Sequence, residues 1–299
     1  MNSKSEFPLV TIGIPTYNRY DQLEKVLDSA LNQTYGYIEI LIGDNSDRSE
    51  IPSLLLRQFI ENPKITYVKH KKNLGAEANH QFLFDNAKGD FFIFFHDDDE
   101  YPLDLIEKLF ESFKLQQDIC LVAPCGVRFL EGKHMYDYFL YTSLPITFYG
   151  RIRDSIRRTY KNIFYMSEHI FYGLYKKSYG RIVYTNIHKF ENYLLFQYLS
   201  KGNVHTTKEV TLIKNTTEME FIKYREGSGR RYVFGLSFLD NGNEMSVNRL
   251  FHVTFQYIFS LLKMTGLSFP QRFKLIGITL GLFFSQGLGS DLKRLSQRS

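Results

Sequence analysis

The sequence predicts an α/β fold with a mainly parallel sheet flanked by helices. Short apolar runs alternate with amphipathic helical segments over about the first 120 positions, which is the pattern of repeated βαβ units. Polar, turn-forming residues follow three of these runs, at 16–19, 44–46 and 97–99. Because ligands of open α/β sheets bind at the carboxyl ends of the strands, these turns are where a binding site is expected.

The first element is a β-branched run at 10–14, which ends at Pro15 and predicts a strand. A helix is expected at 21–32, because its apolar residues recur three and four positions apart. A second strand is expected at 38–42, where an apolar run ends at Gly43. The apolar face of the helix comprises Leu23, Val26, Leu27, Ala30 and Leu31.

A helical segment at 51–60 then leads to a third strand at 65–68. The next helix, at 76–87, is followed by Gly89, a residue typical of helix C-termini. The fourth strand, at 91–95, is apolar throughout, as expected of a strand buried on both faces.

A helix at 103–115 and a strand at 119–123 complete the pattern, and the rhythm is lost after Pro124. The tail from about residue 247 has a broad apolar face and predicts a C-terminal helical extension. Its segment 275–284 is too short to span a membrane, so it is either a core helix or a helix lying in a membrane interface.

Composition and charge narrow the function classes. The 299-residue chain has a net charge of +5 without a long basic run, which suits anionic ligands but does not support nucleic-acid binding. Its two cysteines, Cys120 and Cys125, form a poor zinc signature and fit buried thiols in a reducing compartment. Residues 1–8 lack the apolar core of a signal peptide. A cytoplasmic location is therefore expected.

Three consecutive carboxylates, Asp97, Asp98 and Asp99, follow the apolar run at 91–95 after His96. Packing three like charges together is unfavourable unless a cation neutralises them, and oxygen ligands suit Mg²⁺ or Mn²⁺. The alternative is a solvated acidic turn. The polar turns upstream favour the metal site.

Taken in order, these segments resemble the family 2 glycosyltransferases of the GT-A fold over residues 1–125. The departures are Asn45, where the family usually has a second acid, and Glu77, where it has Arg. The matching segments are Val10-Thr11-Ile12-Gly13-Ile14-Pro15-Thr16-Tyr17-Asn18-Arg19, Leu31-Asn32-Gln33-Thr34-Tyr35 with 38–44, Asn73-Leu74-Gly75 with Asn79, and Gly89-Asp90 with 91–99.

The resemblance implies a pocket for a nucleotide-sugar donor. Asp97 and Asp99 match the metal-binding D-x-D, with Asp99 the more direct ligand, although the register could slip by one. Asp98 either lies beside the donor or caps the helix after Pro102. Asp44 corresponds to the acid that accepts a hydrogen bond from the nucleobase of the donor, or else it caps a turn. The other expected donor-binding residues are Pro15, Thr16, Tyr17, Arg19, Asn73 and Gly75, and Lys71 or Lys72 is a further candidate for phosphate.

An inverting transferase needs a carboxylate to deprotonate the acceptor hydroxyl. The nearest match to the family's base is Glu191, whose alternative role is to begin a helix. Glu168 and His169 are weaker candidates. Arg230 and Arg231 follow a glycine-rich turn and suit a loop that closes over pyrophosphate, or else a plain surface turn.

The resulting hypothesis is a metal-dependent, inverting glycosyltransferase that moves a sugar from a nucleotide donor to a saccharide or lipid-linked acceptor in cell-surface polysaccharide assembly. The expected donor is a UDP-sugar. Peripheral association with the cytoplasmic face of the inner membrane is a further expectation. The alternatives are a non-catalytic nucleotide-sugar or glycan-binding protein and a nucleotidyltransferase. The expected parts are a donor-binding half at 1–125, an acceptor-binding half at 126–231 and a helical region at 232–299.

Overall fold

The computed structural model describes residues 7–47, 57, 61–114, 119–131, 134–139, 171–180, 198, 202–215, 232–233, 236–237, 239–240, 243–244, 258, 262 and 268–282. The chain divides into two compact units. The first comprises Met1–Leu144, His169–Tyr184 and Gly202–Phe221, and the second comprises Pro145–Glu168, Thr185–Lys201 and Ile222–Ser299. The boundaries expected at residues 125 and 231 stay predictions.

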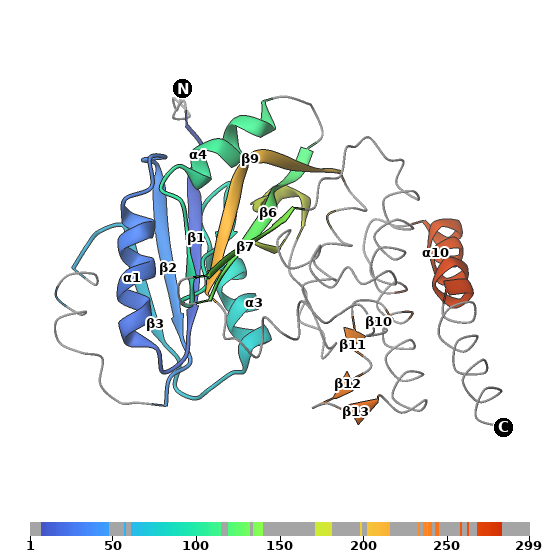
Figure 1. Ribbon diagram of the computed structural model, residues 1–299, viewed down its shortest axis with the longest axis horizontal. Helices are drawn as coiled ribbons and strands as arrows, with labels where there is room; N and C mark the ends of the chain where they lie inside the picture. Colours follow the sequence, from blue (N-terminus) through green and yellow to red (C-terminus); the bar gives the residue numbers. More distant parts are fainter. Residues whose placement is uncertain are drawn as a thin grey trace. The chain divides into compact units, whose positions relative to one another are not determined.

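The described part of the first unit holds a mixed sheet of nine strands and the helices that flank it (Figure 1). The strands are β1 (Val10–Thr16), β2 (Ile38–Asp44), β3 (Ile65–Lys69), β4 (Phe91–Phe94), β5 (Asp99–Glu100), β6 (Ile119–Glu131), β7 (His134–Phe139), β8 (Leu174–Lys176) and β9 (Asn203–Asn215). The helices are α1 (Tyr20–Leu31), α3 (Ala76–Asn86) and α4 (Leu105–Phe113), and a 3₁₀ turn covers Lys177–Tyr179.

The strand order is β3-β2-β1-β4-β8-β6-β9-β5, with β7 paired to β6. β1 to β4 are mutually parallel, and β6 and β9 run in the same direction. β5, β7 and β8 run the opposite way. The prediction of a mainly parallel α/β sheet is therefore confirmed.

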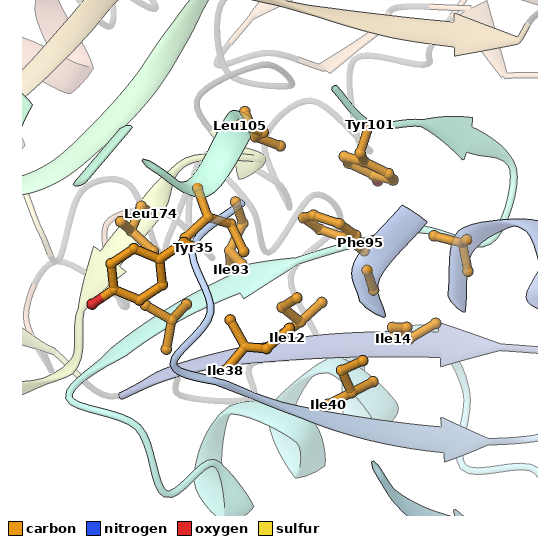
Figure 2. Close-up of a cluster of buried hydrophobic side chains, with 14 of the residues drawn as sticks. Ile12, Ile14, Tyr35, Ile38, Ile40, Ile93, Phe95, Tyr101, Leu105 and Leu174 are labelled. Atoms are coloured by element: carbon orange, nitrogen blue, oxygen red, sulfur yellow. The ribbon is translucent and has the colours of Figure 1, made fainter. Parts of the chain in front are cut away.

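Alternation along the strands builds a separate layer on each face of the sheet. Figure 2 shows one face, where isoleucines of β1 and β2 meet Ile93 and Phe95 in a core that also includes α1 and α4. On the other face, a Cβ built at Gly13 would collide with the ring of Phe92 and come within 3.4 Å of Leu83 Cβ on α3. The lack of a side chain at Gly13 thus lets α3 lie close to β1.

Two strand ends differ from the sequence expectation and matter for the site. β1 continues through Pro15 to Thr16, and β2 continues to Asp44, so both expected turn residues are the last residues of strands. Thr16 lies opposite Asp44 in the parallel register. The two side chains are therefore fixed by the sheet rather than by a loop.

The strand expected at 119–123 is longer than predicted, because β6 continues through Pro124 to Glu131. The pairing of β6 with β9 shifts register between Pro124 and Gly126. Such an irregularity accommodates a proline, which cannot donate to the strand ladder. The helix expected at 51–60 lies outside the described residues, apart from Arg57.

In the second unit the structure describes helix α10 (Phe269–Leu282) and two short hairpins, β10–β11 (Tyr232–Val233 and Leu236–Ser237) and β12–β13 (Leu239–Asp240 and Asn243–Glu244). α10 begins before the position expected from the sequence and holds Pro270 in its first turn, where a missing N–H is tolerated. No helix in the described ranges is long and apolar enough to cross a membrane.

Candidate functional site

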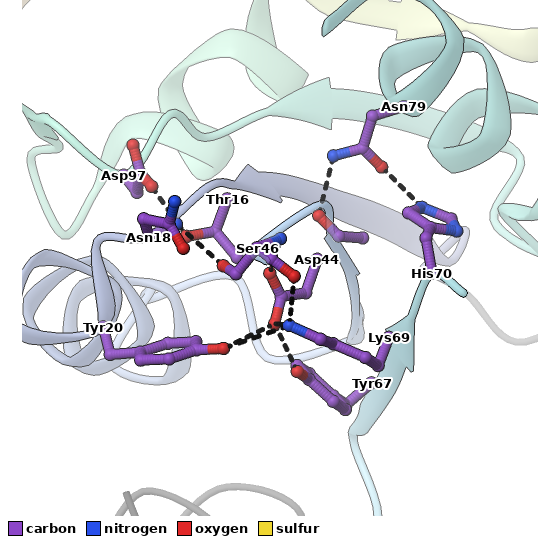
Figure 3. A network of polar contacts seen from close by, with 11 residues as sticks. Thr16, Asn18, Tyr20, Asp44, Ser46, Tyr67, Lys69, His70, Asn79 and Asp97 are labelled. Atoms are coloured by element: carbon purple, nitrogen blue, oxygen red, sulfur yellow. Dashed lines mark hydrogen bonds and ion pairs between the residues drawn. The ribbon is translucent and has the colours of Figure 1, made fainter. Parts of the chain in front are cut away.

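The three polar turns meet at the carboxyl edge of β1, β2 and β4. Thr16 Oγ1 donates a hydrogen bond of 2.7 Å to Asp97 Oδ2 (Figure 3). The Asn45 N–H donates to the Thr16 carbonyl at 3.0 Å. The Asn18 N–H donates to Ser46 Oγ at 2.7 Å. The structure thus brings residues from the three predicted turns into direct contact.

Arg19 lies against two of the three aspartates. Its Nη1 is 3.2 Å from Asp97 Oδ1 and 2.7 Å from Asp98 Oδ2. The Arg19 side chain is 48% exposed, whereas that of Asp97 is 7% exposed. α4 follows Asp104, which holds its N-cap position. Asp98 therefore accepts a hydrogen bond from Arg19 at the tip of β4, and the alternative that it caps α4 is not supported.

Asp97 is a buried acid at a strand end. Burial raises the pKa of Asp97 above its ordinary value, and the neighbouring charge of Asp98 acts in the same direction. The hydrogen bond from Thr16 and the charge of Arg19 lower the pKa but do not cancel this effect. Such a carboxylate is stabilised by any further positive charge that reaches it.

The residues present fit a hard divalent cation. Asp97 and Asp99 are both 8% exposed, and they offer only oxygen atoms, the ligands that Mg²⁺ and Mn²⁺ prefer. In the described ranges no three His, Cys, Asp or Glu side chains form a metal-binding group. One or two carboxylates together with substrate phosphates are the usual way in which proteins hold Mg²⁺.

Asp44 is completely buried in a network of hydrogen-bond donors (Figure 3). Its Oδ1 accepts the Ser46 N–H at 2.7 Å. Its Oδ2 accepts from the hydroxyl of Tyr20 at 3.0 Å, from Lys69 Nζ at 3.3 Å and from the hydroxyl of Tyr67. The carboxylate therefore ties α1, β3 and the turn after β2 together.

These donors also set the charge state of Asp44. Burial alone would raise the pKa of this carboxyl, but the hydrogen bonds from Ser46 and Tyr67, together with Lys69, outweigh it and leave the pKa below its ordinary value. A role for Asp44 in accepting a hydrogen bond from the nucleobase of the donor stays a prediction. The nucleobase would have to compete with the three hydrogen-bond donors already on Oδ2.

Asn45 explains how the loop at 73–75 is held. Its Nδ2 donates to the Gly75 carbonyl at 3.0 Å, and its Oδ1 accepts the Leu74 N–H at 3.1 Å. Asn73 Oδ1 accepts the Gly75 N–H at 2.8 Å, and Gly75 has φ +84°, a conformation that favours glycine. An aspartate at position 45 could not donate to Gly75, so the departure from the family pattern has a structural reason.

The other expected donor-binding residues differ in how far they face solvent. Tyr17 is exposed, and its hydroxyl donates to Asp47, while Pro15 is half-buried. Lys71 and Lys72 are exposed. A solvent-facing ring beside buried polar groups suits stacking against a planar ligand.

A buried polar chain formed by His80, His96 and Tyr172, here named the histidine–tyrosine chain, adjoins the triplet. The Ala76 carbonyl accepts only, so His80 Nδ1, 2.7 Å away, carries the proton. His80 Nε2 then accepts from His96 Nε2 at 3.0 Å, and His96 Nδ1 accepts from the Tyr172 hydroxyl at 2.8 Å. Alternation after β4 directs His96 towards α3 and Asp97 towards α1.

Several residues of the site were not anticipated from the sequence. Tyr67 and Lys69 lie two apart on β3 and therefore share a face; this spacing is the signal that could have linked them to Asp44. His80 and His96 are far apart in the sequence, and no spacing rule connects them. The candidate base Glu191, its alternatives Glu168 and His169, and Arg230 and Arg231 lie outside the described residues.

Comparisons with known proteins show which family and which relatives this chain resembles. The model of the family described as "Glycosyl transferase family 2" matches residues 11–179. An uncharacterised glycosyltransferase of Rickettsia typhi is 29% identical over 140 residues, which are 47% of this chain and 43% of that protein. The GalNAc(5)-diNAcBac-PP-undecaprenol beta-1,3-glucosyltransferase of Campylobacter jejuni is 30% identical over 94 residues, 31% of this chain and 30% of that protein. The chain thus spans less than half the length of these two relatives.

Among solved structures, S. aureus TarS 1–349 in complex with UDP-GlcNAc superposes with a TM-score of 0.57 at 12% sequence identity. The superposition covers 92% of this chain and 72% of that one. At this identity the likeness concerns the fold, and it agrees with the GT-A architecture expected from the sequence.

Proposed function

The chain belongs to glycosyl transferase family 2, and on that premise we propose that it transfers a sugar from a nucleotide-sugar donor to a saccharide or lipid-linked acceptor. One observation carries the proposal: buried Asp97, in the turn after β4, is joined to Thr16, the last residue of β1, and to Arg19, the N-cap residue of α1. This places acidic, basic and hydroxyl groups where ligands of α/β sheets bind.

The donor is proposed to lie along this edge, with its base beside Tyr17 and its diphosphate near Arg19 and the triplet. Arg19 suits the diphosphate because a guanidinium binds phosphate oxygens in a forked geometry. Asp97 and Asp99 would hold Mn²⁺ or Mg²⁺, which stabilises the negative charge of a leaving diphosphate when bound. UDP-sugars are the first donors to test, since UDP-GlcNAc is bound by the similarly folded TarS.

Inversion at the anomeric carbon is proposed because a single displacement needs only a base opposite the leaving group. The acceptor hydroxyl attacks the anomeric carbon, its proton passes to a carboxylate, and the nucleoside diphosphate leaves. Glu191 is the proposed base. Asp97 and Asp99 are not available for this role if they hold the cation.

A lipid-linked acceptor in cell-surface polysaccharide assembly is the proposed context, since the Campylobacter relative is named for an undecaprenol-linked substrate. Peripheral attachment at the cytoplasmic face of the inner membrane is part of this proposal. It draws on α10, where Phe269 and Phe273 are 70% and 58% exposed. Co-sedimentation with anionic lipid vesicles that weakens in the Phe269→Ser, Phe273→Ser variant would support it, and unchanged or absent binding would contradict it.

The test of the activity is a panel of UDP-, GDP- and dTDP-sugars, each with Mn²⁺ and with a chelator. We expect one donor to raise the melting temperature and to be hydrolysed slowly, both only with metal. The Asp97→Asn variant, which keeps the shape of the side chain, should lose both effects. A panel in which no donor stabilises the protein in a metal-dependent way would contradict the proposal, and stabilisation without hydrolysis or transfer would favour a binding protein.

A further inference from the structure

Arg19 occupies the position of a counter-ion at the acidic triplet. Its guanidinium bridges Asp97 Oδ1 and Asp98 Oδ2 at 3.2 and 2.7 Å. The other oxygen of Asp97, Oδ2, accepts the Thr16 hydroxyl at 2.7 Å. Both oxygens of Asp97 therefore accept hydrogen bonds from protein side chains.

A divalent cation and the guanidinium would compete for this carboxylate. Both need the lone pairs of Asp97, and two positive charges held against one buried acid repel each other in a poorly screened environment. The Asp97 side chain is fixed by burial, at 7% exposed, whereas half of the Arg19 side chain faces solvent. Arg19 is therefore the partner that can move.

The donor supplies a reason for Arg19 to move. A diphosphate offers several anionic oxygens, and an arginine binds such oxygens at least as well as it binds a carboxylate. The same oxygens complete the coordination of a cation that the protein holds with only one or two carboxylates. Arrival of the diphosphate would thus release Asp97 and fill the remaining metal positions together.

We infer that Arg19 is a resident counter-ion that keeps a divalent cation out of the triplet until a nucleoside diphosphate draws the guanidinium away. This inference rests on the proposed function. It makes metal and nucleotide binding mutually dependent, because each raises the affinity of the protein for the other by the same factor.

The test measures free Mn²⁺ by electron paramagnetic resonance during titration of the full-length protein, with and without UDP. Without UDP, the Arg19→Gln variant should bind Mn²⁺ at least about tenfold more tightly than the wild type. Arg19→Lys keeps the charge and should stay near the wild type. Lys88→Gln is the matched control, because it removes one exposed positive charge just before β4, at the opposite edge of the sheet.

The effect of UDP separates the inference from a general change in charge. UDP should raise the Mn²⁺ affinity of the wild type strongly and that of Arg19→Gln by a smaller factor. Equal Mn²⁺ affinity of wild type and Arg19→Gln without UDP, or the same gain in Lys88→Gln, would overturn this inference alone. If none of the proteins binds Mn²⁺ even with UDP, the metal part of the proposed function falls and the inference falls with it.

Discussion

Replacing His80 by glutamine removes a titratable ring from the histidine–tyrosine chain while keeping a neutral amide that can accept from His96. In the wild type, burial lowers the pKa of His80 to about 4. Among the described residues, the Ala76 carbonyl, His96, Phe94 and Phe171 lie against the ring. The folded protein therefore keeps His80 neutral at pH values at which an unfolded chain protonates it.

The size of the effect follows from the two pKa values. An unfolded histidine titrates near 6.5, so between about pH 6.5 and pH 4 the unfolded chain binds a proton that folded His80 refuses. Above this window both states are neutral at His80, and the free energy of unfolding is not reduced. As the pH falls through the window, protonation of the unfolded chain lowers the free energy of unfolding. Between pH 7 and pH 5 the loss is about 2 kcal/mol, at about 1.4 kcal/mol for each unit of pKa difference.

Urea denaturation at pH 7 and pH 5 gives the free energy of unfolding under both conditions. The wild type should lose about 2 kcal/mol more than His80→Gln over this interval. His70→Gln is the matched control, because it removes a nearby half-buried histidine that does not belong to the histidine–tyrosine chain. Equal pH dependence in wild type and His80→Gln would refute the assignment of a buried, neutral His80.

Three further changes test packing, catalysis and the metal site. Gly89→Ala should lower the free energy of unfolding by about 1–3 kcal/mol in urea titrations, because its Cβ would lie 2.7 Å from backbone atoms of Leu9, Thr11 and Phe91. Gly36→Ala meets nothing within 4 Å and should cost far less, so equal costs would contradict the packing. Glu191→Gln should abolish transfer but retain donor binding by calorimetry, and unchanged turnover would move the base elsewhere. Asp99→Ala should lose the metal-dependent part of donor binding, and an unaffected response would leave the metal to Asp97 and Asp98.

The early strands and helices could be predicted because their periodicity reflects local geometry. Residues alternating along β1, and recurring three and four apart on α1, face one core and must be apolar. β4 is apolar throughout because both of its faces are buried. Pairing across long sequence distances leaves no such trace. β5 is only two residues long and exists because Asp99 and Glu100 pair with β9, which no local pattern indicates.

The meeting of the three polar turns was predictable to a similar extent, whereas the roles of their residues stay predictions. Strand ends gave Thr16, Asp44 and Asp97 because carboxyl ends of parallel strands share an edge. What the sequence could not give was how each polar atom is satisfied. The amide of Asn45 serves the loop at 73–75 through both of its atoms, and His96 meets His80 only because α3 packs against β4.

Anomalous diffraction from a crystal grown with UDP and Mn²⁺ tests the central claim most directly, since it locates the metal and nucleotide independently of activity. The expected result is a single manganese peak about 2.1 Å from a carboxylate oxygen of Asp97 or Asp99 and from a phosphate oxygen. The uracil base of UDP should lie beside Tyr17, and the Arg19 side chain should have turned from Asp97 towards the diphosphate. Manganese without contact to the triplet, or UDP bound away from the carboxyl edge of β1 and β4, would contradict the claim.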